Sequence, residues 1–254
     1  MTGPVRGPAW RLAGLCLPLA LTACATAGRP TAGDPLEPVN RAVYRFNDVA
    51  DRYVAKPVAV AYEKAIPQLV RTGIRNFFNN IDDVFVIGND LLQGKVTQAS
   101  RDSVRLVGNT VFGGLGLWDL ASTRGLYKNN EDFGQTLGVW GVPGGPYLVL
   151  PFLGPSNFRD LAGFAVYTQA DVIWRINDIP VRNSLVATRA VDARASLLRA
   201  EKILDQAAGD RYGFVRDAYL QRRTSLIYDG NPPSLQPGMD DLEDPGEGAA
   251  DDPK

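Results

Sequence analysis

The chain has 254 residues, with 27 Lys and Arg, 28 Asp and Glu, two Cys and no His. Without His, Ser-His-Asp and Cys-His nucleophile systems are excluded, as is the side chain best suited to proton transfer near neutral pH. Two Cys cannot form a four-Cys zinc cage, so we expect no metal and no cofactor. Enzymes are disfavoured, although carboxylate, Tyr, Lys or Ser-Lys chemistry remains open.

Charge is distributed unevenly along the chain. Residues 1–23 hold two Arg and no acid, residues 24–230 hold 24 basic and 21 acidic residues, and residues 231–254 hold seven acids and one Lys. Apolar residues make up 45% and charged residues 22%, which excludes wholesale disorder. The mildly basic body of an exported chain does not favour nucleic-acid binding.

The N-terminus has the pattern of a secretory signal peptide over residues 1–23. Arg6 and Arg11 precede an uncharged run that ends at small residues before Cys24. The run is too short for a spanning helix, which needs about 20 apolar residues. Leu-Thr-Ala before Cys24 resembles the lipobox of bacterial lipoproteins, in which that Cys is acylated. The alternative is an ordinary signal peptide with an incidental Cys.

Acylation at Cys24 would anchor the chain to a membrane. A lipoprotein Cys normally carries three acyl chains, and two or more suffice for stable anchoring at roughly 0.8 kcal/mol per buried CH₂. Ala25 follows the Cys where Asp would favour inner-membrane retention, which by analogy with enterobacterial sorting favours the outer membrane. Residues 24–33 are small and polar and are expected to form a tether.

The body, residues 34–230, is predicted to be mostly helical. Asp34 as a cap and Pro35 in the first turn are expected to begin a helix. Its apolar face would consist of Leu36, Val39, Val43, Phe46, Ala50 and Tyr53. Further helices are predicted over residues 68–93, 97–112, 184–208 and 212–226. In the last helix, Arg216, Arg222 and Arg223 are expected to form a solvated face.

Residues 133–158 contain no charged side chain, which by hydropathy alone would suit a membrane span. Several prolines and glycines exclude a spanning helix, because each interior proline costs about 3 kcal/mol or more. We expect a short helix over 133–137 and a strand over 147–150. With a second low-charge patch at 106–118, the segment favours a monotopic protein sunk into one leaflet; a buried core loop is the alternative.

Two segments are weak candidates for a catalytic or phosphate-binding site. Adjacent carboxylates at Asp82 and Asp83 do not face each other on a helix and are more simply explained by pairing with basic residues. Residues 113–116 are glycine-rich but lack the ending of a phosphate-binding loop. The tail, residues 231–254, is rich in Pro, Gly and acids and is predicted to be a disordered spacer.

Several sequence blocks follow one another between Asp34 and Arg223. They are Asp34-Pro35-Leu36-Glu37-Pro38-Val39-Asn40-Arg41, Asn89-Asp90-Leu91-Leu92-Gln93-Gly94, Glu131-Asp132-Phe133-Gly134-Gln135-Thr136-Leu137-Gly138, Gly144-Gly145-Pro146-Tyr147 and Val215-Arg216-Asp217-Ala218-Tyr219. In this order the blocks resemble the MlaA/VacJ family of outer-membrane lipoproteins. The resemblance matches nothing over residues 165–185.

The resemblance implies a mostly α, monotopic, ring-like helical membrane protein with a central polar channel and a short Gly/Pro-rich loop or hairpin. Such a protein lies on the periplasmic-leaflet side of the outer membrane. It removes mislocalised phospholipids from the outer leaflet and passes them to the soluble periplasmic phospholipid carrier of the Mla pathway, often bound to a trimeric porin. This maintains lipid asymmetry and requires no enzyme chemistry.

The resemblance also suggests roles for particular residues. Phe46 and Asn47 lie in the first helix, whose packing would control whether the channel is shut. Four residues are expected at the channel or its rim, with packing alone as the alternative role: Gly144, Gly145, Pro146 and Pro151. Two rival functions remain open at this point. One is a scaffold lipoprotein that stabilises a porin complex without moving lipid, and the other is an envelope hydrolase acting through Asp82 or Asp132.

Overall fold

The computed structural model of the chain describes residues 34–201 and 209–233. The predicted leader (1–23), Cys24 with its tether (24–33) and nearly all of the acidic tail lie outside these residues. In chain order the main elements are α2 (Glu37–Ala50), a π-helical turn (Asp51–Ala55), α3 (Lys56–Ala65), α4 (Gln68–Leu92), α5 (Val96–Val111), α6 (Phe133–Val139), β1 (Tyr147–Leu150), β2 (Gly154–Asn157), α7 (Phe158–Ala170), α8 (Ile179–Ser196) and α10 (Arg211–Ile227).

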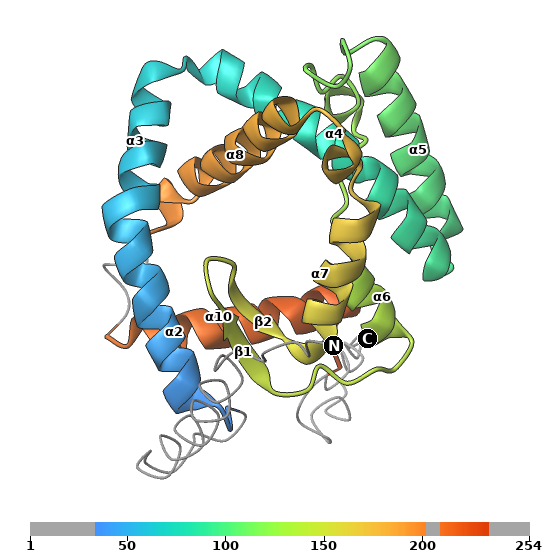
Figure 1. Cartoon of the computed structure of the whole chain (residues 1–254). Helices are drawn as coiled ribbons and strands as arrows, with labels where there is room; N and C mark the ends of the chain where they lie inside the picture. The colour runs from blue at the N-terminus through green and yellow to red at the C-terminus, as the bar shows by residue number, and fades with distance from the viewer. Residues whose placement is uncertain (1–33, 202–208, 234–254) are drawn as a thin grey trace, which may run out of the picture.

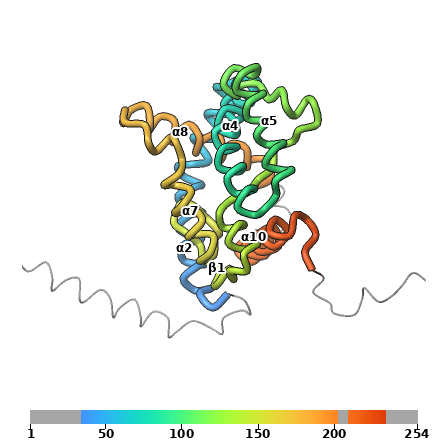
Figure 2. The backbone as a smooth tube through the Cα atoms, turned by 90° about the vertical axis from the view of Figure 1, so that its right-hand side faces the viewer, coloured from blue at the N-terminus to red at the C-terminus, as the bar shows by residue number. Residues whose placement is uncertain are grey.

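The helices follow the sides of a frame (Figure 1). The continuous run of α2 and α3 forms one side, α4 continues from it with α5 packed outside, α7 lies opposite α2, and α10 forms the base. Helix α8 packs against both α3 and α4. The β1–β2 hairpin rises from the base toward the middle of the frame. Figure 2 shows α10 on one side of this frame and the connection from α7 to α8 on the other.

Most predicted elements are confirmed. Helices α4, α5 and α10 match the predicted ranges within one or two residues, and α6 and β1 lie where the uncharged segment predicted a helix and a strand. Gly94 follows α4 with φ of 77°, a left-handed conformation that ends a helix without strain in a residue lacking Cβ.

The predicted start of the first helix is wrong. Helix α2 begins at Glu37 with Pro38 in its first turn, and no side chain caps it. The Asp34 carboxylate instead accepts hydrogen bonds from Asn40 and Tyr212 inside the protein. The helix also continues beyond the predicted face, through the π-helical turn and α3 to Ala65.

The later helices differ more from the prediction. Helix α8 begins at Ile179, five residues before the predicted start, and ends at Ser196. Residues 202–208 of the predicted helix lie outside the described residues. The buried residues of α8 are Asp192 and Ala195, so its buried face includes a charged side chain. Helix α7 was not predicted; the Asn157 side chain caps it by accepting from the Asp160 N–H, at the end of the uncharged segment.

The interior is unusually polar and the surface unusually apolar. Among the described residues, 17 polar or charged residues are buried against 11 apolar ones, and 35 large apolar residues are exposed. Helix α5 shows this inversion plainly. It buries Ala99, Asp102, Arg105 and Asn109, while Val96, Val104, Val107 and Val111 form an exposed stripe. Such broad apolar exposure marks a surface that meets a membrane or another protein.

Length and hydropathy together distinguish the helices of the described residues from a membrane span. Within residues 34–201 and 209–233, no helix combines the length and hydropathy that a span requires. The exposed apolar side chains are therefore distributed over several shorter or amphipathic helices instead of one continuous span.

A buried ion-pair network joins α4 to α5. Arg105, which is 3% exposed, donates from Nε to Asp83 at 3.1 Å and from Nη2 to Asp119 at 2.8 Å. Lys128 also pairs with Asp83. Although burial opposes ionisation, hydrogen bonds from Arg105 and Ser122 lower the pKa of Asp119 to about 2. The two helices are thus joined by charges where most soluble helical hairpins use apolar side chains.

Replacing Arg105 tests how far the fold depends on this network. Arg105→Met leaves the Asp83 and Asp119 carboxylates short of a buried partner, and it should lower the free energy of unfolding by about 3 kcal/mol. Chemical unfolding in a mild detergent measures this. Arg101→Met, at an exposed position on the same helix, is the control and should change stability by less than about 0.5 kcal/mol. Equal losses in both variants would contradict the account.

Candidate functional site

The uncharged segment forms a β-hairpin. Strand β1 pairs antiparallel with β2, with Tyr147 opposite Asn157 and Leu150 opposite Gly154. At the tip, Phe152 adopts φ of 62°, a left-handed conformation that is uncommon for a bulky residue. An isolated two-stranded hairpin is marginal in water. Its position therefore depends on what holds its outer edge.

Helix α2 holds that edge through two asparagine side chains. Asn40 Nδ2 donates to the Tyr147 carbonyl at 2.9 Å, and its Oδ1 accepts from the Val149 N–H at 2.9 Å. Asn47 repeats the pattern, donating to the Leu150 carbonyl at 2.9 Å and accepting from the Phe152 N–H at 2.8 Å. Each side-chain amide thus donates one hydrogen bond to the hairpin backbone and accepts one from it, as the backbone of a neighbouring strand would.

The spacing of the two asparagines explains this arrangement. They are seven residues apart, which is about two turns, so both project from the same face of α2. Asn40 binds the backbone within β1, and Asn47 binds the last residue of β1 and Phe152 in the turn that follows. We call Asn40, Asn47 and the backbone groups that they bind the asparagine clasp.

An aromatic pair extends the clasp at the hairpin tip. The rings of Phe46 and Phe152 are 5.1 Å apart between centroids and meet edge to face. Phe46 is 49% exposed, Phe152 77% and Leu153 58%. Among the hydrogen bonds, ion pairs and ring contacts of the described residues, those of Asn47 and this aromatic pair hold the tip against α2, so the tip has few specific contacts.

The hairpin base is fixed far more firmly. Tyr147 and Val149 are buried with Tyr212 of α10. Tyr212 donates a hydrogen bond to the buried Asp34 carboxylate, which also accepts from Asn40 Nδ2 at 2.9 Å. Burial and this hydrogen bond raise the pKa of Tyr212 above its ordinary range. The base therefore joins α2, β1 and α10 into one unit, from which the tip extends.

The six non-lipid site residues predicted from the sequence fall into two groups. The structure brings Phe46 and Asn47 together with the tip, which begins at Pro151. The other three lie in the loop that leads into the base: Gly144, Gly145 and Pro146. There Gly145 has φ of 69°, and the Gly144 carbonyl accepts from the Arg159 N–H at 3.3 Å. Cys24 lies outside the described residues.

Arg223 was predicted to be solvated, and that prediction is wrong. Its guanidinium donates to Asp132 of the α6 cap at 3.0 Å and to Asp160 of α7 at 2.8 Å, so it ties α6, α7 and α10 together. Burial would raise the pKa of Asp132, but the Arg223 guanidinium outweighs it and lowers that pKa below its usual range.

Asp82, the other carboxylate considered for hydrolysis, also has hydrogen-bond and ion-pair partners. Asp82 accepts from Tyr167 of α7 at 3.0 Å and pairs with Arg189 of α8. A general acid or base needs a titratable group that is free to exchange protons with a substrate. Carboxylates held in ion pairs with arginines suit a structural role better than that one. No group of acidic or Cys side chains among the described residues has a metal-binding arrangement.

Sequence reasoning missed a buried carboxyl pair. Asp90 of α4 is fully buried beside Asp102 of α5 and accepts from Gln98 at 2.8 Å. Burial and the neighbouring Asp102 carboxyl raise the pKa of Asp90 to about 7. The protonated form of Asp90 can donate to Asp102, which makes this pair a titratable contact between the two helices.

Comparison with known proteins places the chain in a family. Residues 32–226 match the family model of the "MlaA lipoprotein". Two proteins described as "Intermembrane phospholipid transport system lipoprotein MlaA", from Shigella flexneri and from Escherichia coli (strain K12), are each 35% identical over 238 residues, which cover 88% of this chain and 93% of theirs.

A solved structure has the same fold. A chain from "Structural basis for maintenance of bacterial outer membrane lipid asymmetry" superposes with a TM-score of 0.68 at 32% identity, covering 76% of this chain and 98% of its own length. The fold and the sequence match thus define a mostly helical protein of a lipoprotein family. The chain belongs to the MlaA lipoprotein family, as its sequence motifs indicated.

The clasp predicts which residue controls the mobility of the tip. Asn47→Ala removes both side-chain hydrogen bonds to the tip backbone and should weaken the tip contact by about 1 kcal/mol, which corresponds to roughly fivefold faster amide exchange at Phe152. Hydrogen exchange of the purified protein measures this. Arg45→Ala, two residues away and exposed, is the control. Unchanged exchange at Phe152 in the Asn47 variant would show that the clasp does not hold the tip.

The carboxyl pair predicts a pH dependence of stability. Because the pKa of Asp90 is raised from 3.8 to about 7, its protonated form is favoured in the fold. That contribution is complete below about pH 4 and is lost as pH rises to about 7. Asp90→Asn keeps the acceptor for Gln98 and supplies a permanent donor to Asp102. Unfolding at pH 4 and pH 8 should show the variant to be more stable than wild type only at pH 8; an equal difference at both would refute this.

Proposed function

We propose that this protein removes phospholipids from the outer leaflet of the outer membrane through a polar channel between its helices. In this proposal the helices form a ring that lies in the membrane plane, and the hairpin tip closes the channel. The observation that carries the proposal is the asparagine clasp, because it holds a weakly supported hairpin tip against α2 in the middle of the frame (Figure 1).

The physical need for such a channel comes from the headgroup. A charged headgroup that crosses hydrocarbon unaided loses its hydration, which is costly even for a single charge. Buried polar side chains inside and apolar side chains outside are the pattern that a wet passage in an apolar setting requires. No bond is made or broken, so the absence of His from the chain is no obstacle.

The proposal places the protein on the periplasmic-leaflet side of the outer membrane. Acylated Cys24 provides the anchor, and the exposed apolar residues of α5 and the α7–α8 connection contact lipid tails. A soluble periplasmic carrier of the Mla pathway accepts the phospholipid on the far side, and a trimeric porin is the membrane partner. Both partners come from the family resemblance.

A scaffold function remains the second candidate because of one surface. Val104, Gly108, Phe112, Leu120 and Leu126 line an apolar groove at α5, which suits a protein partner as well as lipid. In a scaffold the hairpin tip would have no reason to move. The two functions therefore differ in what release of the tip does to lipid distribution.

Deleting Phe46 and Asn47 together tests the proposal. The deletion removes the aromatic pair and half of the clasp, so the tip is released and phospholipid should leak into the outer leaflet. Phospholipase-accessible phospholipid on intact cells measures the leak. An open channel acts even beside a wild-type copy, whereas mere loss of function does not, so the effect should be dominant.

The matched control replaces Arg45 and Asp48 of the same helix with Ala, and it should leave surface phospholipid unchanged. A deletion variant that folds and reaches the membrane, yet gives no dominant rise, would favour the scaffold.

A further inference from the structure

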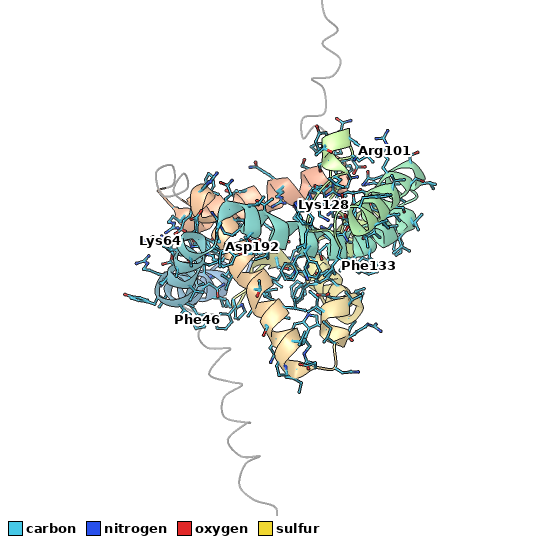
Figure 3. All side chains as sticks on the ribbon, turned by 90° about the horizontal axis from the view of Figure 1, so that it is seen from above. Phe46, Lys64, Arg101, Lys128, Phe133 and Asp192 are labelled. Atoms are coloured by element: carbon cyan, nitrogen blue, oxygen red, sulfur yellow. The ribbon has the colours of Figure 1, made fainter. Side chains whose placement is uncertain are left out.

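A charged cavity of about 460 Å³ lies between α4, α7, α8 and α10. This volume is in the range of small-molecule sites, about 300–1,000 Å³. Its wall includes Lys128, Arg189, Arg222 and Arg223, together with the apolar Phe85 and Leu226. The cavity lies away from the hairpin tip: Figure 3 shows Lys128 well separated from Phe46 across the molecule.

Three of the four cations in this wall already have carboxylate partners. Lys128 pairs with Asp83, Arg189 with Asp82 and Asp171, and Arg223 with Asp132 and Asp160. Arg222 is exposed and makes no ion pair with any residue of the described part of the chain. It is therefore the surplus positive charge at the cavity and is available to an anionic ligand.

An unpartnered acceptor lies in the same wall. Gln135 is 2% exposed and donates from Nε2 to the Asn130 carbonyl at 2.8 Å, but its Oε1 has no hydrogen-bond partner within the described residues. A buried acceptor without a donor is unfavourable. The cavity thus presents the Arg222 cation to an anionic group and the Gln135 Oε1 acceptor to a hydrogen-bond donor. A phosphate ester that carries an amine or a hydroxyl has both of these groups.

A second cavity, of about 230 Å³, adjoins the first. The two share Asp82, Phe85 and Tyr167 in their walls. The second is lined mostly by apolar residues of α4, α6 and α7 and extends to exposed Val84 and Val166 on the outer surface. Charge on one side and apolar walls on the other match the two ends of a single amphiphile.

The wall that the two cavities share is polar on one side and aromatic on the other. Tyr167 donates to Asp82 at 3.0 Å and accepts from Arg189, while its ring meets Phe85 edge to face with centroids 5.1 Å apart. A ligand that spans both cavities would have its charged end on the Arg189 side of this wall and its apolar end on the Phe85 side.

We infer that these two cavities form one binding site for a single phospholipid, with the headgroup phosphate at Arg222, the headgroup donor at Gln135 Oε1 and one acyl chain in the apolar cavity between α4 and α7. This site lies between α4, α7, α8 and α10, away from the hairpin tip. The inference rests on the proposed function for the lipid's identity, but it assigns residues that the hairpin mechanism does not use.

Gly88 allows the acyl-chain cavity to be filled without disturbing the fold. It lies on α4 in the apolar cavity wall, and a Cβ added there meets no atom within 4 Å. Gly108 of α5 is equally open and lines the separate apolar groove. Gly88→Leu should therefore block the acyl chain, and Gly108→Leu is its matched control. Arg222→Glu tests the headgroup end, with Arg101→Glu on α5 as its control.

The measurement is native mass spectrometry of the full lipidated chain, stripped of lipid in mild detergent and incubated with equimolar dioleoyl-phosphatidylethanolamine. We expect one bound lipid in wild type and in both controls, and about tenfold lower occupancy in Gly88→Leu and Arg222→Glu. Dioleoyl-phosphatidylcholine, whose headgroup has no N–H donor, should bind more weakly than phosphatidylethanolamine. Occupancy in Gly88→Leu equal to that in Gly108→Leu overturns the acyl-chain assignment, and equal binding of both lipids overturns the role of Gln135.

The lipid site and the proposed function can be refuted independently. If the clasp deletion leaves surface phospholipid unchanged while the Gly88 variant loses its bound lipid, the channel proposal fails and the lipid site stands. If occupancy is unaffected by both Gly88→Leu and Arg222→Glu while the clasp deletion leaks, the lipid site is refuted and the channel proposal stands.

Discussion

Buried charge, paired across helices, is the constraint on which this structure depends. Arg105, Arg189 and Arg223 each join elements that are distant in sequence, and the small apolar core leaves them as the principal links. Removing one partner of such a pair leaves an uncompensated charge, so the helices hold a defined arrangement. Many large apolar side chains face outward instead, where a membrane or another protein can cover them.

Within this rigid frame the hairpin is the exception. Its base is buried with Tyr147 and Tyr212, but its tip depends on one aromatic contact and the two hydrogen bonds of Asn47. A few weak contacts at the end of a firm support give an element that can be held or released at small cost in free energy. In the proposed function, that difference in support, more than the shape of the frame, is what lets the tip act as a gate.

Much of the fold could be predicted from the sequence, because helix periodicity and helix ends are local signals. Gly94 ends α4 as expected, and Phe46 and Asn47 lie in the first helix, as the resemblance indicated. The partners could not be predicted. Nothing local separates Arg223 from a solvated arginine, since Asp132 and Asp160 are 91 and 63 residues away. Helix α7 was missed for a related reason: its Phe158, Phe164 and Val166 are exposed, so no buried apolar face marks it.

In the proposed function, movement of the hairpin tip away from α2 lets phospholipid pass. Phe46→Cys and Phe152→Cys place two thiols where the rings now touch, and a short cleavable bifunctional thiol reagent can join them. The measurement is the rate at which a fluorescent phospholipid crosses between leaflets of vesicles that contain the protein. We predict that crosslinking stops the protein-dependent rate and that cleaving the link restores it. Equal rates in the linked and cleaved states would contradict the claim.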